Sequence, residues 1–179
     1  MRENFRIRCG LSIGIKSRIR DGESMPLVVY EDYASRFIVG YGLFKEATSH
    51  NSVEVLKEAI VRYGKPRSIL SDRGVQFYAV ESEARKKGLT EIFLMRNHIK
   101  HILERVSHPQ TNGKAEKLFD EVGKKVKFFL SIDECVAWYN TIKPHAALDL
   151  KKPIGAYYEK MQQTAILVEP SILEKEVSS

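Results

Sequence analysis

Cysteine is scarce in this sequence, and long apolar runs are missing from it. Cys9 and Cys135 are the two thiols among 179 residues. They are too few for a disulfide scaffold or a four-cysteine zinc site, so we expect a reducing, cytoplasmic location. No apolar run approaches the ~18 residues that span a membrane. Arg2, Arg6 and Arg8 interrupt the N-terminus where a signal peptide would be apolar. These absences predict a soluble protein with no membrane partner.

Acidic residues are missing from one stretch, between Asn4 and Arg20. Residues 1–20 hold six basic groups and one acid, a balance of +5, whereas the rest of the chain holds 23 basic and 22 acidic groups, a balance of +1. A basic arm of this kind can grip nucleic-acid phosphates. It can equally be a poorly templated remnant of a disrupted gene. Gly10, Ser12 and Gly14 slightly favour the remnant, because they break the apolar pattern of a central strand.

Strand-like and helical segments alternate through the middle of the chain. Turn residues such as Gly64 and Pro66 separate these segments, and a helix with Ser49 or Asn51 as its N-cap is expected to run to Gly64. The other expected elements are strands over residues 26–30, 37–44, 66–70 and 101–106, and a helical stretch over 79–97 that is broken at Gly88. Such alternation predicts an α/β sandwich. His98 and His101 have no cysteines or acids at ligand spacing, so we expect ordinary surface or strand histidines.

The second half of the chain is predicted to be mostly helical. Apolar residues recur there at steps of three and four, which predicts a stripe that packs on a sheet; they are Ala115, Phe119, Val122, Val126 and Phe129. Glu116 lies beside this stripe in the first turn, where the helix dipole favours an ionised carboxylate.

Two short segments carry the chemistry of this sequence. Residues 71–77 (SDRGVQF) place Asp72 directly after an apolar run that reads as a buried strand, and residues 107–116 (SHPQTNGKAE) form a turn-rich loop that leads to Glu116. Carboxylates on neighbouring rigid elements suit divalent ions coordinated by oxygen. The pair therefore points to metal-dependent chemistry.

These segments resemble the DDE integrase and transposase superfamily. The resemblance extends to residues 32–41 (DYASRFIVGY), to the YN and KPHAAL segments within 139–148, and to 153–157 (PIGAY). It implies an α/β fold with a ribonuclease-H-like mixed sheet flanked by helices and a helical C-terminal part. It also implies DNA as partner, Mg²⁺ or Mn²⁺ as cofactor, and strand transfer in DNA integration or transposition. A homo-oligomer, or a mixed oligomer with intact transposase, is expected.

The resemblance assigns roles to individual residues. Asp72 and Glu116 match the second and third acids of the family's catalytic triad, and are therefore the expected catalytic residues and metal ligands. Nucleic-acid contacts are expected from the loop before Glu116 and from the residue after it, that is, from Gln110, Asn112, Lys114 and Lys117.

The first acid of the triad has no counterpart at the expected place. Counting back without gaps from residues 34–37 puts it at or near Lys16. An ammonium cannot ligate a metal, and each unit charge interaction at ~4 Å is worth about 1 to 4 kcal/mol. Metal affinity should then fall steeply. The alternative is an alignment shifted by a few positions, with Asp21, Glu23 or Asp32 as the missing ligand.

Three hypotheses follow for the chain. It is an integrase or transposase core of doubtful activity, a non-catalytic DNA-binding or dimerising relative, or a remnant without a partner. The expected organisation is an atypical basic segment over residues 1–20, a catalytic-core-like domain over 21–160 and a tail over 161–179. The helix-turn-helix or zinc-binding domain usual at the family's N-terminus is not expected here.

Overall fold

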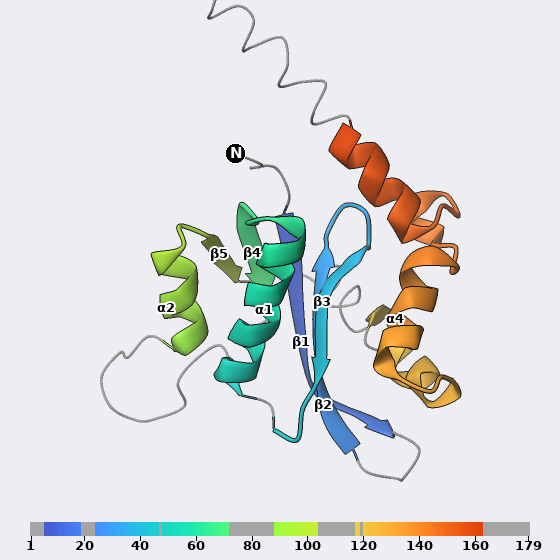
Figure 1. Ribbon diagram of the computed structural model, residues 1–179, viewed down its shortest axis with the longest axis horizontal. Helices are drawn as coiled ribbons and strands as arrows, with labels where there is room; N and C mark the ends of the chain where they lie inside the picture. Colours follow the sequence, from blue (N-terminus) through green and yellow to red (C-terminus); the bar gives the residue numbers. More distant parts are fainter. Residues whose placement is uncertain are drawn as a thin grey trace, which may run out of the picture.

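The computed structural model describes residues 6–18, 24–46, 48–71, 88–103, 117–118 and 120–162. The strands are β1 (Arg6–Arg18), β2 (Ser24–Asp32), β3 (Ile38–Leu43), β4 (Ser68–Ser71) and β5 (Lys100–Leu103). They form one five-stranded sheet in the order β3-β2-β1-β4-β5 (Figure 1). β2 runs antiparallel to both of its neighbours, β1 and β3, whereas β4 runs parallel to β1 and β5 runs parallel to β4.

The central strand is β1, which lies within the basic N-terminal stretch. It pairs with β2 on one side and with β4 on the other. Gly10 and Ser12 keep regular pairing with β2, and the register shifts only between Ser12 and Ser17. Hydrogen bonding along both edges thus compensates for the weak local strand pattern. The division of the chain at residues 20 and 160 stays a prediction.

Capping and turn residues mark the start and the end of helix α1. α1 (Ser49–Tyr63) begins after Thr48, whose side chain accepts a hydrogen bond from the Asn51 backbone N–H at 3.2 Å, so the N-cap is one residue earlier than the sequence suggested. It ends at Gly64, which adopts φ 91°. The remaining elements are α2 (Leu89–Arg96), helical residues 120–125, the 3₁₀ turn η2 (Val126–Phe128), α4 (Ile132–Thr141), the 3₁₀ turn η3 (Ala146–Leu148) and helical residues 153–162.

Both faces of the sheet are buried, by different helices. Successive residues of a strand point to opposite faces, and in β2 Val28 and Tyr30 face one core while Leu27 and Val29 face the other. The first core is completed by α1, α2 and Tyr157 from residues 153–162, and the second by residues 118–126 and α4 (Figure 1). No helix in the described ranges is long and apolar enough to cross a membrane.

Candidate functional site

Among the described residues, the end of β4 comes closest in the sequence to Asp72, the first candidate acid. Its last residue, Ser71, is fully buried and directly precedes Asp72 in the sequence. The Ser71 Oγ lies 2.8 Å from the Nε2 of His101 on β5. Burial lowers the pKa of His101, against an opposing effect of Glu91, so this imidazole is neutral at physiological pH. The end of β4 is therefore anchored to β5 through a neutral histidine.

The helix that follows Glu116 is fixed on the sheet through its apolar side. Leu118, Val122 and Val126 are buried in the second core against Leu27 and Val29 of β2. The stripe expected from the sequence therefore packs where it was predicted at Val122 and Val126. Lys117, directly after Glu116, is exposed. The site residues Asp72, Gln110, Asn112, Lys114 and Glu116 lie outside the described residues.

A buried ionic cluster connects β2 with α4 on this face of the sheet. Glu31 is 2% exposed, and its two carboxylate oxygens accept hydrogen bonds from the Tyr139 hydroxyl at 3.2 Å and from Arg36 Nη1 at 3.4 Å. Burial, together with the charge of Glu31, raises the pKa of Tyr139. Tyr139 of the YN segment and Arg36 of the DYASRFIVGY segment thus both contact Glu31. Their role here is to hold α4 against the sheet.

Beside this cluster is a small cavity of about 130 Å³ that reaches Lys117. Its charged lining is mostly compensated: Glu31 pairs with Arg36, and Glu121 pairs with Lys143. His145 also lines the cavity, and its Nδ1 accepts a hydrogen bond from the Ala147 N–H at 3.2 Å. Burial and the nearby Lys143 lower the pKa of His145. Lys117 therefore contributes a positive charge at the cavity next to the helix start.

Asp32 has a structural role in this fold. It is fully buried, and its Oδ2 accepts hydrogen bonds from the backbone N–H of Ser35 at 3.0 Å and from its hydroxyl at 2.6 Å. Lys160 donates to Oδ1 at 2.8 Å. Both oxygens are thus occupied by the following turn and by helical residues 153–162, which argues against Asp32 as a substitute metal ligand. Asp21 and Glu23 lie outside the described ranges.

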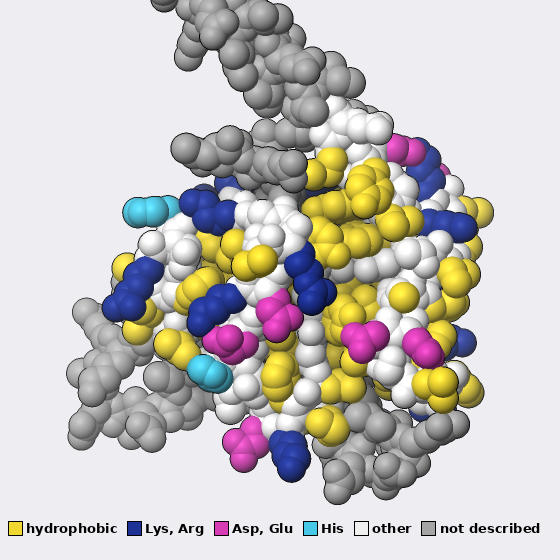
Figure 2. All heavy atoms as spheres, viewed as in Figure 1, with side chains coloured by type: hydrophobic (Ala, Val, Ile, Leu, Met, Phe, Trp, Pro, Cys, Tyr) yellow, Lys and Arg dark blue, Asp and Glu magenta, His cyan; other side chains and the backbone are white. Residues whose placement is uncertain are grey.

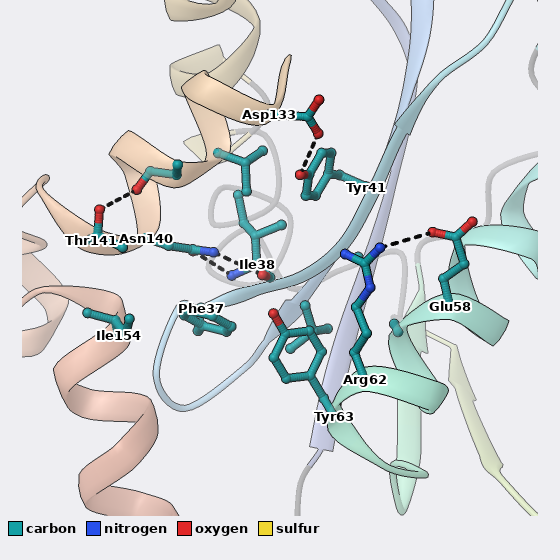
Figure 3. A pocket seen from close by; sticks show the side chains of 15 residues that line it. Phe37, Ile38, Tyr41, Glu58, Arg62, Tyr63, Asp133, Asn140, Thr141 and Ile154 are labelled. Carbon is teal, nitrogen blue, oxygen red and sulfur yellow. Dashed lines mark hydrogen bonds and ion pairs between the residues drawn. The ribbon is translucent and has the colours of Figure 1, made fainter. Parts of the chain in front are cut away.

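A larger cavity, of about 280 Å³, lies at the other edge of the sheet between α1 and α4 (Figure 3). Figure 2 shows hydrophobic side chains in a band between these helices, bordered by charged ones. The floor of the cavity is the edge strand β3. There the Asn140 side chain accepts a hydrogen bond from the N–H of Ile38 at 2.9 Å and donates one to its C=O at 3.0 Å. Tyr41 donates to Asp133 across the cavity at 2.7 Å. Because β3 and β4 are separated by two strands, this cavity is not part of the acid-bearing site.

Within the part of the chain that the structure describes, no three His, Cys, Asp or Glu residues are grouped to hold a metal ion. The predicted metal ligands Asp72 and Glu116 lie outside those ranges and stay a prediction. The sequence did not predict the Ser71–His101 contact or the partners of Glu31. The sequence marks Glu31 only as lying at the end of an apolar run, whereas Asp32 was also considered as a substitute metal ligand.

Comparison with known proteins gives consistent results. The family model described as integrase core domain matches residues 15–109, just over half of the chain. An uncharacterized protein from Archaeoglobus fulgidus is 33% identical over 109 residues, which are 61% of this chain and 87% of that protein.

Solved structures of integrase cores have the same fold. The HTLV-2 integrase catalytic core domain in complex with magnesium, in its dimeric form, superposes with a TM-score of 0.60 at 18% identity, over 84% of this chain and 93% of that chain. The BIV integrase catalytic core domain gives a TM-score of 0.62 at 14% identity, over 90% and 98% of the two chains. The predicted ribonuclease-H-like mixed sheet with flanking helices is confirmed by these structures and by the observed strand order.

Proposed function

Because the chain belongs to the integrase core domain family, we propose that it is a DNA-binding, integrase- or transposase-like core. Its ancestral reaction is metal-dependent DNA strand transfer, in which Asp72 and Glu116 hold Mg²⁺ or Mn²⁺, and its present activity is impaired. Gln110, Asn112, Lys114 and Lys117 are the proposed DNA contacts. DNA and a second copy of the chain, or an intact transposase, are the proposed partners, and the cytoplasm is the proposed location.

The observation that carries the proposed impairment is the composition of β1. This strand pairs in parallel with β4, the strand that ends immediately before Asp72. None of its 13 residues is acidic. The resemblance expects the first acid of the triad on the family's first strand, and the first strand of this chain is β1. The absence of an acid from β1 supports an incomplete acid set.

The register of β1 and β4 supports a position for the vacant acid. Arg8 pairs with Leu70, so the register continued by two residues would bring Gly10 beside Asp72. Lys16, the position reached by counting along the sequence, is six residues further on, roughly 20 Å at the rise of a strand. We therefore place the vacancy at Gly10 rather than at Lys16.

The face of the sheet agrees with this position. Gly10 pairs with Val29 across β1 and β2, and directly paired residues share a face of the sheet. Val29 lies in the second core with Leu118, which is two residues after Glu116. A carboxylate at position 10 would thus lie on the face covered by the helix that follows Glu116.

The donor set has a direct chemical consequence. A divalent ion would act as a Lewis acid and orient the phosphate and attacking oxygen, and two ions ~4 Å apart would do so for both attacking and leaving oxygens. Two such ions need several anionic oxygens to offset their repulsion. With β1 lacking acids and Asp32 occupied by Ser35 and Lys160, the residues present fit weak binding of one ion better than a two-ion centre.

The test is plasmid nicking with Mn²⁺ by four proteins: the original chain, Asp72→Asn, Gly10→Asp and Lys16→Asp. The original chain and Asp72→Asn should be equally inactive. Gly10→Asp should restore nicking, whereas Lys16→Asp, the matched introduction of an acid elsewhere in β1, should not. Circular dichroism melts establish that each variant is folded. Nicking by the original chain that Asp72→Asn abolishes would show that the acid set is complete.

The non-catalytic alternative is favoured by the same acid-free strand. In that case the chain binds DNA and assembles with itself or with intact transposase, without cutting. Co-purification with a tagged intact transposase, together with DNA binding by the inactive chain, is the expected result. A chain that binds neither DNA nor transposase would instead be the remnant of the third hypothesis.

A further inference from the structure

An exposed aromatic ring flanked by two lysines follows the helix of residues 120–125. Phe128 of η2 is 71% exposed. The Nζ atoms of Lys125 and Lys127 lie 5.5 and 5.0 Å from the centre of its ring. Neither lysine has a carboxylate within ion-pair distance among the described residues, whereas neighbouring Lys124 pairs with Asp120 at 2.6 Å. The ring and these two lysines are called here the η2 patch.

Tertiary structure brings a second basic segment to this patch. η2 is in contact with β1, although more than 100 residues separate the two in sequence. β1 contains four basic residues and no acid: Arg6, Arg8, Lys16 and Arg18. The strand that carries most of the basic residues of the N-terminal stretch is therefore in contact with the turn that carries Phe128.

We propose that the η2 patch binds single-stranded nucleic acid. Lysines neutralise backbone phosphates without reading sequence, and an exposed aromatic face offers a platform on which any base can stack. Both groups occur together here, and the charge is complementary to that of the ligand. A stacked base would displace one lysine from the ring toward the adjoining phosphate.

The patch is separate from the predicted acid site. From Lys117 to Phe128 is 11 residues, roughly 16 Å at the rise of a helix. The inference extends the proposed function, since it adds a second contact for the same class of ligand, but it uses none of the residues named for catalysis. Stacking requires unpaired bases, so a single strand is favoured over a duplex.

The first experiment measures binding of a fluorescein-labelled 20-nucleotide single strand to the full chain by anisotropy at several salt concentrations. Lys125→Ala/Lys127→Ala should reduce the slope of log affinity against log salt by about 1.4, at ~0.7 per phosphate contact on single strands. The matched control is Lys57→Ala/Lys65→Ala, which removes the same charge from α1 and the residue that follows its C-cap. The control slope should stay within error of the original.

The second experiment tests the ring. Phe128→Leu keeps an apolar side chain but removes the stacking face, and should weaken single-strand binding about 5- to 100-fold. The chain has a single tryptophan, Trp138. The centre of its ring lies 5.7 Å from that of Phe129, the residue that follows Phe128. The emission of Trp138 should therefore change when a single strand binds, and less so in Phe128→Leu. Emission of the free variant reports whether the fold is retained.

Three results would overturn the proposal. The first is an equal loss of single-strand affinity in the α1 control, and the second is unchanged single-strand binding in both patch variants. The third is binding to anionic vesicles with none to oligonucleotides, which would make the exposed Phe128 and Leu130 a membrane contact. Single-strand binding is measured without Mn²⁺, so its result does not depend on nicking. A failure of nicking and a failure of patch binding are thus separate outcomes.

Discussion

Two neighbouring acids show how the fold separates residues that look equivalent in the sequence. Glu31 and Asp32 are adjacent on β2, and successive strand residues point to opposite faces. Glu31 pairs with Arg36 and accepts from Tyr139, whereas Asp32 pairs with Lys160 and caps the turn at Ser35. Each acid is buried with its charge compensated. Each acid therefore holds neighbouring elements of the fold together.

The hydroxyl of Tyr139 should contribute measurably to stability. Tyr139→Phe removes the hydrogen bond to Glu31 and leaves a buried carboxylate oxygen with one donor fewer, which should lower the free energy of unfolding by about 1 to 3 kcal/mol. The measurement is urea denaturation. Tyr158→Phe is the control, because this side chain is 61% exposed. Equal stabilities of the two variants would mean that the bond to Glu31 contributes nothing.

At the level of elements, α4 is attached to the edge strand β3 by side chains in place of a further strand. Asn140 satisfies both backbone groups of Ile38, and Asp133 in the first turn of α4 accepts from Tyr41. An edge strand that is covered in this way is protected from pairing with other chains.

The Tyr41–Asp133 bond can be followed by its titration. Burial and the Asp133 carboxylate raise the pKa of Tyr41 to about 12, from an ordinary value of 10.0. The folded protein therefore keeps this proton between pH 10 and 12 while the unfolded chain loses it, so the stability due to this group decreases as pH rises through that range. In an ultraviolet titration at alkaline pH, Tyr41→Phe should remove the transition near pH 12 and Asp133→Asn should shift it to lower pH. A transition near pH 12 that persists in Tyr41→Phe belongs to another tyrosine.

At the level of the whole molecule, two histidines make the free energy of unfolding depend on pH. Burial lowers the pKa values of His101 and His145, so the unfolded chain binds protons near the ordinary value of about 6.5 that the folded chain does not. Stability is therefore full above that pH and decreases as pH falls below it.

The urea concentration at the midpoint of unfolding should accordingly be lower at pH 5.5 than at pH 7. His101→Gln/His145→Gln should show a smaller fall over the same range, whatever its stability at pH 7. The exposed His50 provides the control substitution, His50→Gln. An identical pH dependence in the double variant and the original chain would show that these two imidazoles remain titratable in the folded state.

The sequence predicted much of the fold because the relevant signals are local. Alternation of apolar residues and turn residues predicted strands over 26–30, 37–44 and 66–70, and the structure has β2, β3 and β4 at those places with ends shifted by a few residues. Gly64 marked the end of α1 as expected. Helix ends and strand patterns depend on neighbours in the chain, so they can be read before folding.

The sequence alone also determined that no acid stands between Asn4 and Arg20, and it predicted that Asp72 follows a strand and that Glu116 opens a helix. Only the tertiary structure decided that the acid-free segment is the central strand, that Arg8 pairs with Leu70 of β4, and that Asp32 is paired with Lys160. The partners in these contacts lie 62 to 128 residues apart. Pairing over such separations is fixed by strand register and side-chain burial, which leave no periodic trace in the sequence.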